Sequence, residues 1–170
     1  MQNLKIAIVG ATGMVGRTFL KVCEEYDLKA DYTLLASARS AGKKLEFFGK
    51  EYEVKELTEH SFDEGFDIAL FSAGGSTSEK FSPIAAAHGC VVIDNSSAWR
   101  MDPEVPLVVP EVNPEDIKWN RGIIANPNCS TIQAVVALKP LHDKYGIKRI
   151  VYSTYQAVSG AGVAGYEDLK

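Results

Sequence analysis

One cysteine of the chain stands in a context suited to nucleophilic chemistry. Residues 126–133 are Asn-Pro-Asn-Cys-Ser-Thr-Ile-Gln, so a loop containing Pro127 leads into a helix-forming run that starts at Ser130. The unpaired N–H groups and the dipole at a helix N-terminus favour an anion, and therefore the reactive thiolate form of Cys129. The alternative is a small buried cysteine with only a packing role, which is what most cysteines are.

A glycine-rich turn near the N-terminus predicts nucleotide binding. Residues 4–9 form an apolar run typical of a buried strand, residues 10–16 have the spacing G-x-x-G-x-x-G, and residues 17–26 have the pattern of an amphipathic helix. In dinucleotide-binding folds such glycines let the backbone approach a pyrophosphate, which sits on the helix N-terminus. Because the required strand and helix flank the motif, we favour nucleotide binding over a mere tight turn.

The end of the next expected strand favours NADP over NAD. A strand over residues 32–36 is followed by Ser37-Ala38-Arg39-Ser40-Ala41-Gly42-Lys43. NAD sites usually place a carboxylate here for the ribose 2′-hydroxyl. Hydroxyl groups and two cations stand here instead, and a guanidinium pairs well with phosphate oxygens. The alternative is a solvated basic loop; Asp31 is expected to precede the strand, on the wrong side to reach the ribose.

A dense polar cluster follows a later apolar run. Residues 94–100 are Asp-Asn-Ser-Ser-Ala-Trp-Arg, directly after the expected strand 91–93. Arg100 could clamp a phosphate or carboxylate, although for an arginine taken alone a surface salt bridge is the simpler interpretation. Asp94 is expected to organise the turn rather than to bind a metal, and no metal site is predicted.

Further elements complete the first part of the chain. Strands are expected over residues 68–71 and 123–125, a helix over residues 78–88, and a hairpin over residues 45–57 with Gly49-Lys50 at its turn. The small residues at 72–77, among them Ala73 and Gly74, fit a cofactor passing over the sheet edge, or equally a turn whose helix is capped by Ser or Thr.

The last forty residues are expected to begin a second unit. The helix from Ser130 should kink or end at Pro140. Residues 147–158 are rich in β-branched and aromatic side chains and should form the first strand of another domain. Gln156, near the end of that strand, could orient a substrate, and the loop at Ser159-Gly160 could touch the nicotinamide side of a cofactor.

The composition sets the class of protein. The chain has 170 residues, a net charge of −4 and three irregularly spaced cysteines, which argues against a disulfide framework and favours a reducing cytoplasm. Cys23 and Cys90 are assigned to the core, and His60, His88 and His142 to the surface. No basic stretch indicates nucleic acid as a partner and no apolar run indicates a membrane span. The predicted fold is α/β: a Rossmann-like, doubly wound, mostly parallel sheet over residues 1–130, with residues 131–170 starting an α+β catalytic or dimerisation domain.

Taken together, these motifs closely resemble the aspartate-semialdehyde dehydrogenase family. The matching segments, in family order, are residues 10–16, 37–43, 72–77, 94–100, 110–113, 126–133 and 155–162. The resemblance implies that Cys129 is the acylated nucleophile, that Gln156 positions the substrate, and that Asn95 and Arg100 line a phosphate site. It further implies NADP contacts from Thr12, Gly13, Met14, Val15, Ser37, Arg39, Ser40, Ala41, Ser159 and Gly160, beside the turn glycines Gly10 and Gly16.

The chemistry implied by the resemblance agrees with the residues. The Cys129 thiolate would attack the carbonyl of L-aspartyl 4-phosphate, phosphate would leave on the Arg100 side, and NADPH would reduce the thioester to L-aspartate 4-semialdehyde. This reaction belongs to lysine, threonine, methionine and diaminopimelate biosynthesis. The complete enzyme is expected to use inorganic phosphate in the reverse direction and to form a homodimer or homotetramer.

One departure from the family is large. Its enzymes are roughly double this length, and their general-base histidine and the Arg and Glu that bind the amino acid lie in the half missing here. None of the three histidines matches those positions, so little or no turnover is expected from this chain alone. The rivals are N-acetyl-γ-glutamyl-phosphate reductase, whose family carries Gly-Cys-Tyr-Pro at the nucleophile where this chain has Asn128-Cys129-Ser130-Thr131, and a non-catalytic NADP-binding module with a structural Cys129.

Overall fold

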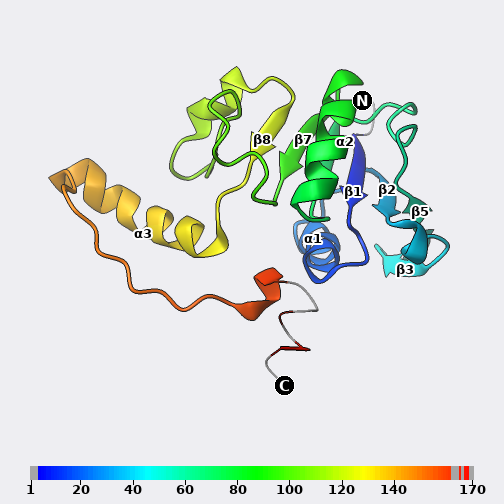
Figure 1. Cartoon of the computed structure of the whole chain (residues 1–170), viewed down its shortest axis with the longest axis horizontal. Coiled ribbons are helices and arrows are strands. Elements are labelled where there is room, and N and C mark those ends of the chain that lie inside the picture. The colour runs from blue at the N-terminus through cyan, green and yellow to red at the C-terminus, as the bar shows by residue number, and fades with distance from the viewer. Residues whose placement is uncertain (1–3, 162–164, 166, 169–170) are drawn as a thin grey trace.

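The centre of the molecule is a six-stranded parallel sheet, as the computed structural model of residues 4–161, 165 and 167–168 shows (Figure 1). The strand order is β5-β2-β1-β6-β7-β8, and a separate antiparallel pair is formed by β3 and β4. The strands are β1 (Lys5–Val9), β2 (Asp31–Ala36), β3 (Lys44–Phe47), β4 (Lys50–Glu53), β5 (Lys55–Glu56), β6 (Ile68–Phe71), β7 (Val91–Asp94) and β8 (Ile123–Ala125). The helices are α1 (Met14–Glu25), α2 (Gly75–Ala87) and α3 (Cys129–Tyr145), with short 3₁₀ turns η1 (Ala38–Ser40), η2 (Pro114–Trp119) and η3 (Val158–Ala161).

Alternating side chains of β1 fill a core on each face of the sheet. Ile6 and Ile8 point into one cluster, which Leu20 and Cys23 of α1 cover from outside. Ala7 and Val9 point into the other cluster, which holds Ala85 of α2 together with the aromatic rings of Phe62, Phe66 and Phe71. Because successive residues of a strand face opposite sides, β1 needs an unbroken apolar run, and a helix covers each face. The predicted doubly wound α/β fold is therefore confirmed.

The order of the strands reverses between β1 and β6. From β1 the chain moves outward to β2 and then β5 on one side, and it returns to β6 before moving outward to β7 and β8 on the other side. Loops at the carboxyl ends of two adjacent strands diverge at such a point, and ligands of open α/β sheets bind in the crevice between them. A ligand site is therefore expected at the carboxyl ends of β1 and β6.

Both helices that follow the central strands begin earlier than the sequence predicts. Helix α1 begins at Met14 rather than residue 17, and α2 begins at Gly75 rather than residue 78. The preceding residues, Gly13 and Gly74, occupy the N-cap positions without a side-chain hydrogen bond. The serine or threonine cap considered for α2 is therefore not formed. Asp31 is the first residue of β2, paired with Lys5, and so lies at the end of the strand remote from η1.

The hairpin is present, but its turn lies one residue earlier than predicted. Strands β3 and β4 pair with Phe47 opposite Lys50, which leaves Phe48 and Gly49 as the central turn residues. Their φ angles are 50° and 64°, and two positive values are what a tight turn between twisted antiparallel strands requires. The turn therefore places Phe48, rather than Lys50, beside Gly49.

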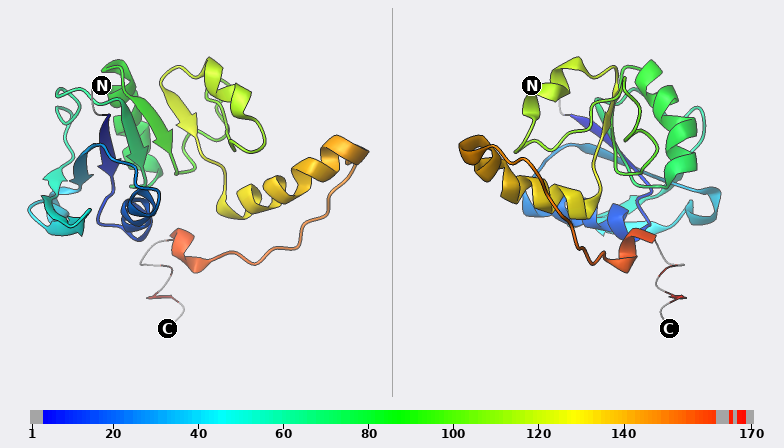
Figure 2. Two further views of the ribbon diagram at one scale, coloured as in Figure 1. Left: turned by 180° about the vertical axis from the view of Figure 1, so that it is seen from behind. Right: turned by 60° about the vertical axis from the view of Figure 1, so that its left-hand side comes forward.

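Helix α3 leads away from the sheet, and the following segment leads back. The helix passes through Pro140 without ending there and closes at Gly146, which has φ 67°. Figures 1 and 2 show the chain after Gly146 running back beneath α3 toward the N-terminal end of α1. The strand predicted over residues 147–158 is wrong: residues 147–157 are extended but pair with no strand among the described residues. A strand needs a neighbour for its N–H and C=O groups, and the described part of residues 131–170 supplies none.

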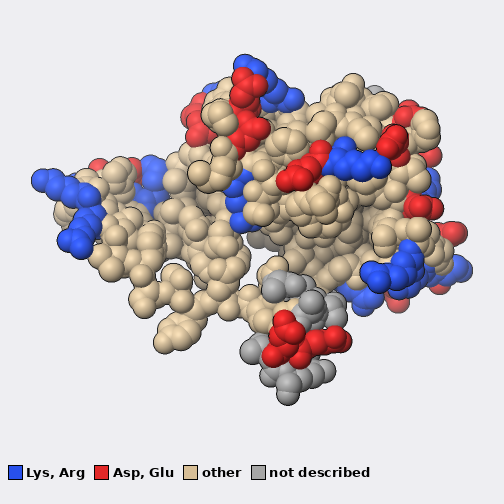
Figure 3. All heavy atoms as spheres, in the orientation of Figure 1, with Lys and Arg blue, Asp and Glu red and all other residues tan. Residues whose placement is uncertain are grey.

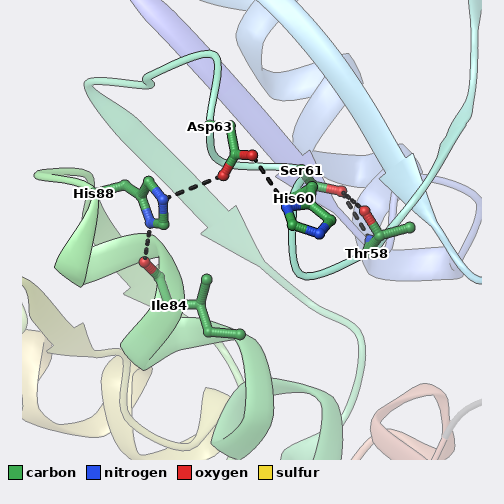
Figure 4. Close-up of polar contacts among 6 residues, drawn as sticks. All are labelled: Thr58, His60, Ser61, Asp63, Ile84 and His88. Atoms are coloured by element: carbon green, nitrogen blue, oxygen red, sulfur yellow. Dashed lines mark hydrogen bonds and ion pairs between the residues drawn. The ribbon is translucent and has the colours of Figure 1, made fainter.

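A cluster of polar residues joins the loop before β6 to the C-terminal end of α2, on the side of the sheet where β6 and β7 begin (Figure 4). Asp63 contacts His60 Nδ1 at 3.1 Å through one carboxylate oxygen and His88 Nε2 at 3.2 Å through the other, and His88 Nδ1 donates to the carbonyl oxygen of Ile84. The side chain of His60 is 88% exposed, as predicted. Among the described residues, no three metal-ligating side chains are arranged to hold an ion, and no described helix is long and apolar enough to cross a membrane.

Candidate functional site

A cavity of about 590 Å³ opens where the strand order reverses. Its walls come from the turn after β1, the N-terminus of α2, the loop after β7, the start of α3 and the turn η3, so residues far apart in sequence meet there. The lining residues are Gly13, Met14, Val15, Ser72, Gly74, Gly75, Asn95, Ser96, Ser97, Arg100, Asn128, Cys129, Gln156, Ala157 and Gly160.

The turn after β1 approaches its neighbours too closely for any residue but glycine. A Cβ atom on Gly16 would lie 2.1 Å from the carbonyl oxygen of Gly10, and one on Gly10 would lie 2.3 Å from that of Ser72. Gly10 also has φ 87°. This close packing leaves the backbone of Gly13, Met14 and Val15 facing the cavity at the N-terminus of α1, where unpaired N–H groups favour an anion. The first turn of α1 holds no acidic residue, so the site fits the pyrophosphate of a dinucleotide.

The basic segment after β2 lies at the same edge of the sheet. Because β2 neighbours β1 in parallel, η1 emerges beside the glycine turn, and the Thr12 hydroxyl donates to Ser40 Oγ at 3.3 Å. The side chains of Ser37, Arg39 and Ala41 are exposed. Among the described residues, Arg39 has no carboxylate within ion-pair distance. Its guanidinium is therefore available for an anion placed at the end of β2.

Cys129 is the first residue of α3. The side chain of Asn128 caps this helix, accepting hydrogen bonds from the N–H groups of Ser130 (3.0 Å) and Thr131 (3.4 Å). Cys129 is exposed, whereas Cys23 and Cys90 are 6% and 1% exposed. Burial, with a smaller contribution from the charge of Asp67, raises the pKa of Cys90 to about 12. Of the three cysteines, only Cys129 lines the cavity, and it does so at a helix N-terminus, where unpaired N–H groups favour an anion.

Arg100 is held by main-chain oxygen atoms at the ends of two strands. Its Nε donates to the carbonyl oxygen of Asn126 at 2.9 Å and its Nη2 to that of Asn95 at 3.2 Å. The side chains of those two residues also pair, since Asn126 Nδ2 donates to Asn95 Oδ1 at 2.6 Å. No acidic side chain pairs with Arg100 within the described part of the chain, so it is not the surface salt bridge considered from the sequence. Arg100 lines the cavity, and the N–H groups that these two bonds leave over are available as donors to an anion there.

Asp94 organises the loop that carries Arg100, as predicted. It is fully buried at the end of β7, and its Oδ2 accepts a hydrogen bond from Ser96 Oγ at 2.6 Å. Ser96 Oγ in turn accepts from the N–H of Ala98. The other carboxylate oxygen of Asp94, Oδ1, accepts no hydrogen bond from the described residues. Asp94 therefore acts through the shape of the loop rather than by facing the cavity.

The structure brings only part of the predicted residue set to the cavity wall. Gly13, Met14, Val15, Gly74, Asn95, Arg100, Cys129, Gln156 and Gly160 line it, whereas Gly10, Thr12, Gly16, Ala73 and the four residues at the end of β2 lie outside its wall. The side chain of Ser159 lies outside the described part of the structure. Six further residues line the cavity without having been predicted as site residues, namely Ser72, Gly75, Ser96, Ser97, Asn128 and Ala157. All six lie inside the motif segments 72–77, 94–100, 126–133 and 155–162, which was the signal available.

Comparison with known proteins agrees with this geometry. Residues 5–120 match the family model described as semialdehyde dehydrogenase, NAD binding domain. The chain belongs to the semialdehyde dehydrogenase family. Residues 138–170 match a second model of this family, described as its dimerisation domain. Membership of the family predicted from the sequence motifs is thus confirmed.

Individual members of the semialdehyde dehydrogenase family resemble the chain over almost all of its length. It is 68% identical over 169 residues to aspartate-semialdehyde dehydrogenase of Aquifex aeolicus, covering 98% of this chain and 50% of that protein. The crystal structure of aspartate semialdehyde dehydrogenase II of Vibrio cholerae complexed with ASA has a TM-score of 0.93 at 54% identity, covering 99% of this chain and 51% of that one. The crystal structure of aspartate semialdehyde dehydrogenase with NADP from Candida albicans has a TM-score of 0.70 at 28% identity, covering 86% of this chain and 48% of that one. The chain therefore spans about half the length of the relatives it matches.

Proposed function

We propose that this chain carries the cofactor domain and the nucleophile of an NADP-dependent aspartate-semialdehyde dehydrogenase of amino-acid biosynthesis. The observation that carries the proposal is the meeting, in one cavity, of the exposed Cys129 at a capped helix N-terminus, the glycine turn at the N-terminus of α1, and Arg100. The names of the relatives and the Asn128-Cys129-Ser130 sequence favour this enzyme over N-acetyl-γ-glutamyl-phosphate reductase. The exposure of Cys129 argues against a merely structural thiol.

In this proposal the residues of the chain divide the work of the first half-reaction. The Cys129 thiolate attacks the carbonyl carbon of L-aspartyl 4-phosphate, the C–O bond to phosphate breaks, and a thioester forms on Cys129. Arg100 stabilises the departing phosphate, and Asn95, which lines the same cavity, supplies a second donor. Gln156, which lines the cavity just before η3, orients the acyl group. NADPH, when bound at the glycine turn, would supply the hydride that converts the thioester into L-aspartate 4-semialdehyde.

The preference for NADP over NAD is also part of the proposal. It is supported by Arg39, Ser37 and Ser40 at the end of β2, where NAD sites usually have a carboxylate, and by the relative solved with NADP. Isothermal titration of both cofactors would test it: NADP should bind more tightly, and Arg39→Glu should weaken NADP by about tenfold while sparing NAD. Equal affinities in the unchanged chain would contradict the preference.

Acyl transfer to Cys129 gives a direct test of the proposed reaction. The chain is incubated with L-aspartyl 4-phosphate without NADPH, and peptides are analysed by mass spectrometry. We expect an aspartyl adduct on Cys129, none on Cys23 or Cys90, and none in the Cys129→Ala variant. An unmodified Cys129 together with tight NADP binding would instead support the non-catalytic module.

Activity of the whole protein is proposed to need more than this chain. The general base and the residues for the amino-acid end of the substrate are expected outside it. His60 and His88 lie where β6 and β7 begin, whereas the cavity lies where the strands end. The relatives are also twice as long. We propose a homodimer or homotetramer for the complete enzyme, in keeping with the dimerisation-domain match, and a reducing cytoplasm that keeps the three cysteines as thiols.

A further inference from the structure

Two buried hydroxyl groups on α2 have no role in the proposed reaction. Ser78 and Ser82 lie one turn apart, are 1% and 0% exposed, and place their Oγ atoms 2.8 Å from each other. Serine in the interior of a helix is no better than neutral for helix stability, and a buried hydroxyl is costly unless it is hydrogen-bonded. Since two hydroxyl groups can form more hydrogen bonds than the one between them, a further hydrogen-bond partner is expected outside the helix.

That partner is the indole of Trp99. Its Nε1 donates to Ser78 Oγ at 2.9 Å, and because an indole can only donate, the serine hydroxyl is the acceptor in this bond. Between Ser78 and Ser82 either hydroxyl can be the donor. Trp99 directly precedes Arg100 in the loop after β7. Ser78 lies in the first turn of α2, and the N–H of Ser78 donates to Gly74, which lines the cavity. This hydrogen bond thus ties the loop of Arg100 to the N-terminal end of α2, and residues of both segments line the cavity.

We propose that Trp99 is a positioning residue for the anion site, acting through Ser78. The carbonyl oxygens of Asn95 and Asn126 fix Arg100 to the ends of β7 and β8, but neither contact fixes it relative to α2. The Trp99–Ser78 bond supplies that constraint, so it sets the gap between the guanidinium group and the N-terminus of α2. Without the Trp99–Ser78 bond, Arg100 is still present, but its guanidinium group spends less time at the position that binds phosphate. Affinity for phosphate therefore falls more than affinity for the cofactor. This inference rests on the proposed role of Arg100 in binding phosphate.

Trp99→Phe and Ser78→Ala each remove one side of the bond. The probe is inorganic phosphate, and its dissociation constant is measured in the full chain by protection of Cys129 from iodoacetamide, with NADP affinity measured in parallel. We expect each variant to bind phosphate about three- to tenfold more weakly, the range that one lost hydrogen bond gives, with NADP affinity changed by less than about twofold. The double variant should lose little more than either single one, because both remove the same interaction.

The chain offers a matched control in its other tryptophan. The indole of Trp119 contacts Asp116 Oδ1 at 3.3 Å and is 47% exposed, away from the cavity, so Trp119→Phe should leave phosphate affinity unchanged. A lowered melting temperature of Trp99→Phe and Ser78→Ala with unchanged phosphate affinity would overturn the inference and reduce the bond to a structural one. If Arg100→Gln also leaves phosphate affinity unchanged, the proposed phosphate site itself is wrong, and the two failures are thereby distinguished.

Discussion

At the scale of single residues, the environment of each side chain decides what the sequence leaves open. The motif around Cys129 pointed to a nucleophile, and the glycine spacing pointed to a cofactor. The way Arg100 is held was not predictable, because the two oxygens that accept from it lie in loops after β7 and β8, 31 positions apart in the chain. Only the parallel pairing of those strands brings them together, and that pairing is not visible in either segment alone.

Asn128 should matter for both stability and reactivity. Its side chain accepts from two N–H groups at the start of α3, and replacing such a cap by alanine costs about 1 kcal/mol. We expect Asn128→Ala to lower the free energy of unfolding by that amount and to slow alkylation of Cys129 several-fold, because the helix end that presents unpaired N–H groups beside the sulfur frays.

Asn128→Ser is the matched variant, since serine keeps a cap acceptor and should retain most of both properties. Urea denaturation and the rate of iodoacetamide labelling measure the two effects. Equal alkylation rates in Asn128→Ala and the unchanged chain would separate the reactivity of Cys129 from its place at the helix end.

Cys90 should make the fold sensitive to high pH. Burial raises its pKa to about 12 in the folded chain, against about 8.5 for a free cysteine. Below pH ~8.5 the thiol is neutral in both states and its contribution is complete. As the pH rises toward 12 the unfolded state ionises first, so stability falls by at most about 1.4 kcal/mol per pH unit.

Chemical denaturation of the unchanged chain and Cys90→Ala at pH values from about 7 to 10 would test this. The variant should be less stable at neutral pH, because it leaves a small cavity, yet its stability should fall less steeply above pH ~8.5. Parallel slopes would mean that the Cys90 thiol does not contribute to the loss.

At the scale of elements, the strands and the glycine turn follow from local sequence, while element ends depend on contacts. Apolar runs located all four inner strands of the sheet. The early starts of α1 and α2 were missed because Gly13 and Gly74 cap them without a side-chain signal. The strand expected over residues 147–158 was wrong for a different reason: its side chains suit a sheet, but no neighbouring strand lies among the described residues.

Two glycines at the starts of the helices should respond very differently to alanine. In Gly16→Ala the new Cβ would lie 2.1 Å from a backbone oxygen, so the turn and α1 must separate. We expect a loss of several kcal/mol in stability and of measurable NADP binding. Gly75→Ala meets nothing within 4 Å and has no positive φ, so it should be neutral or slightly stabilising. Thermal unfolding compares them, and similar melting temperatures would contradict the close packing of the turn.

At the scale of the whole molecule, the surface around α3 differs from the rest. No residue of α3 is buried, and large apolar side chains are exposed along α3 and the returning segment, namely Val136, Leu141, Tyr145, Ile150, Val151, Tyr152 and Tyr155. Figure 3 shows charged side chains gathered where α3 ends and the returning segment begins, with few along the rest of these two elements. Contiguous apolar surface of this kind marks an interaction site, in keeping with the dimerisation-domain match of residues 138–170.

The chain should therefore associate through this surface. Sedimentation velocity at increasing concentration should show dimers or larger species, and replacing Tyr145, Val151 and Tyr155 together by Lys should shift the distribution toward monomer. Tyr26, the C-cap residue of α1, is 82% exposed and belongs to neither α3 nor the returning segment, so Tyr26→Lys is the control and should change nothing. A chain that stays monomeric at about 100 μM would contradict the prediction.

The route of the chain from Cys129 to Gln156 has a mechanical consequence. Helix α3 has 17 residues and so extends about 25 Å outward, while residues 146–156 can span about 36 Å on the way back. The return leg is extended, and no strand partner holds it within the part of the chain that the structure describes. Gln156 therefore reaches the cavity at the end of an unpaired segment whose other end is joined through α3 to the nucleophile. One proteolytic cut between residues 148 and 153 would leave the sheet, the glycine turn and the thiol intact while breaking the covalent link, through α3, between Gln156 and Cys129.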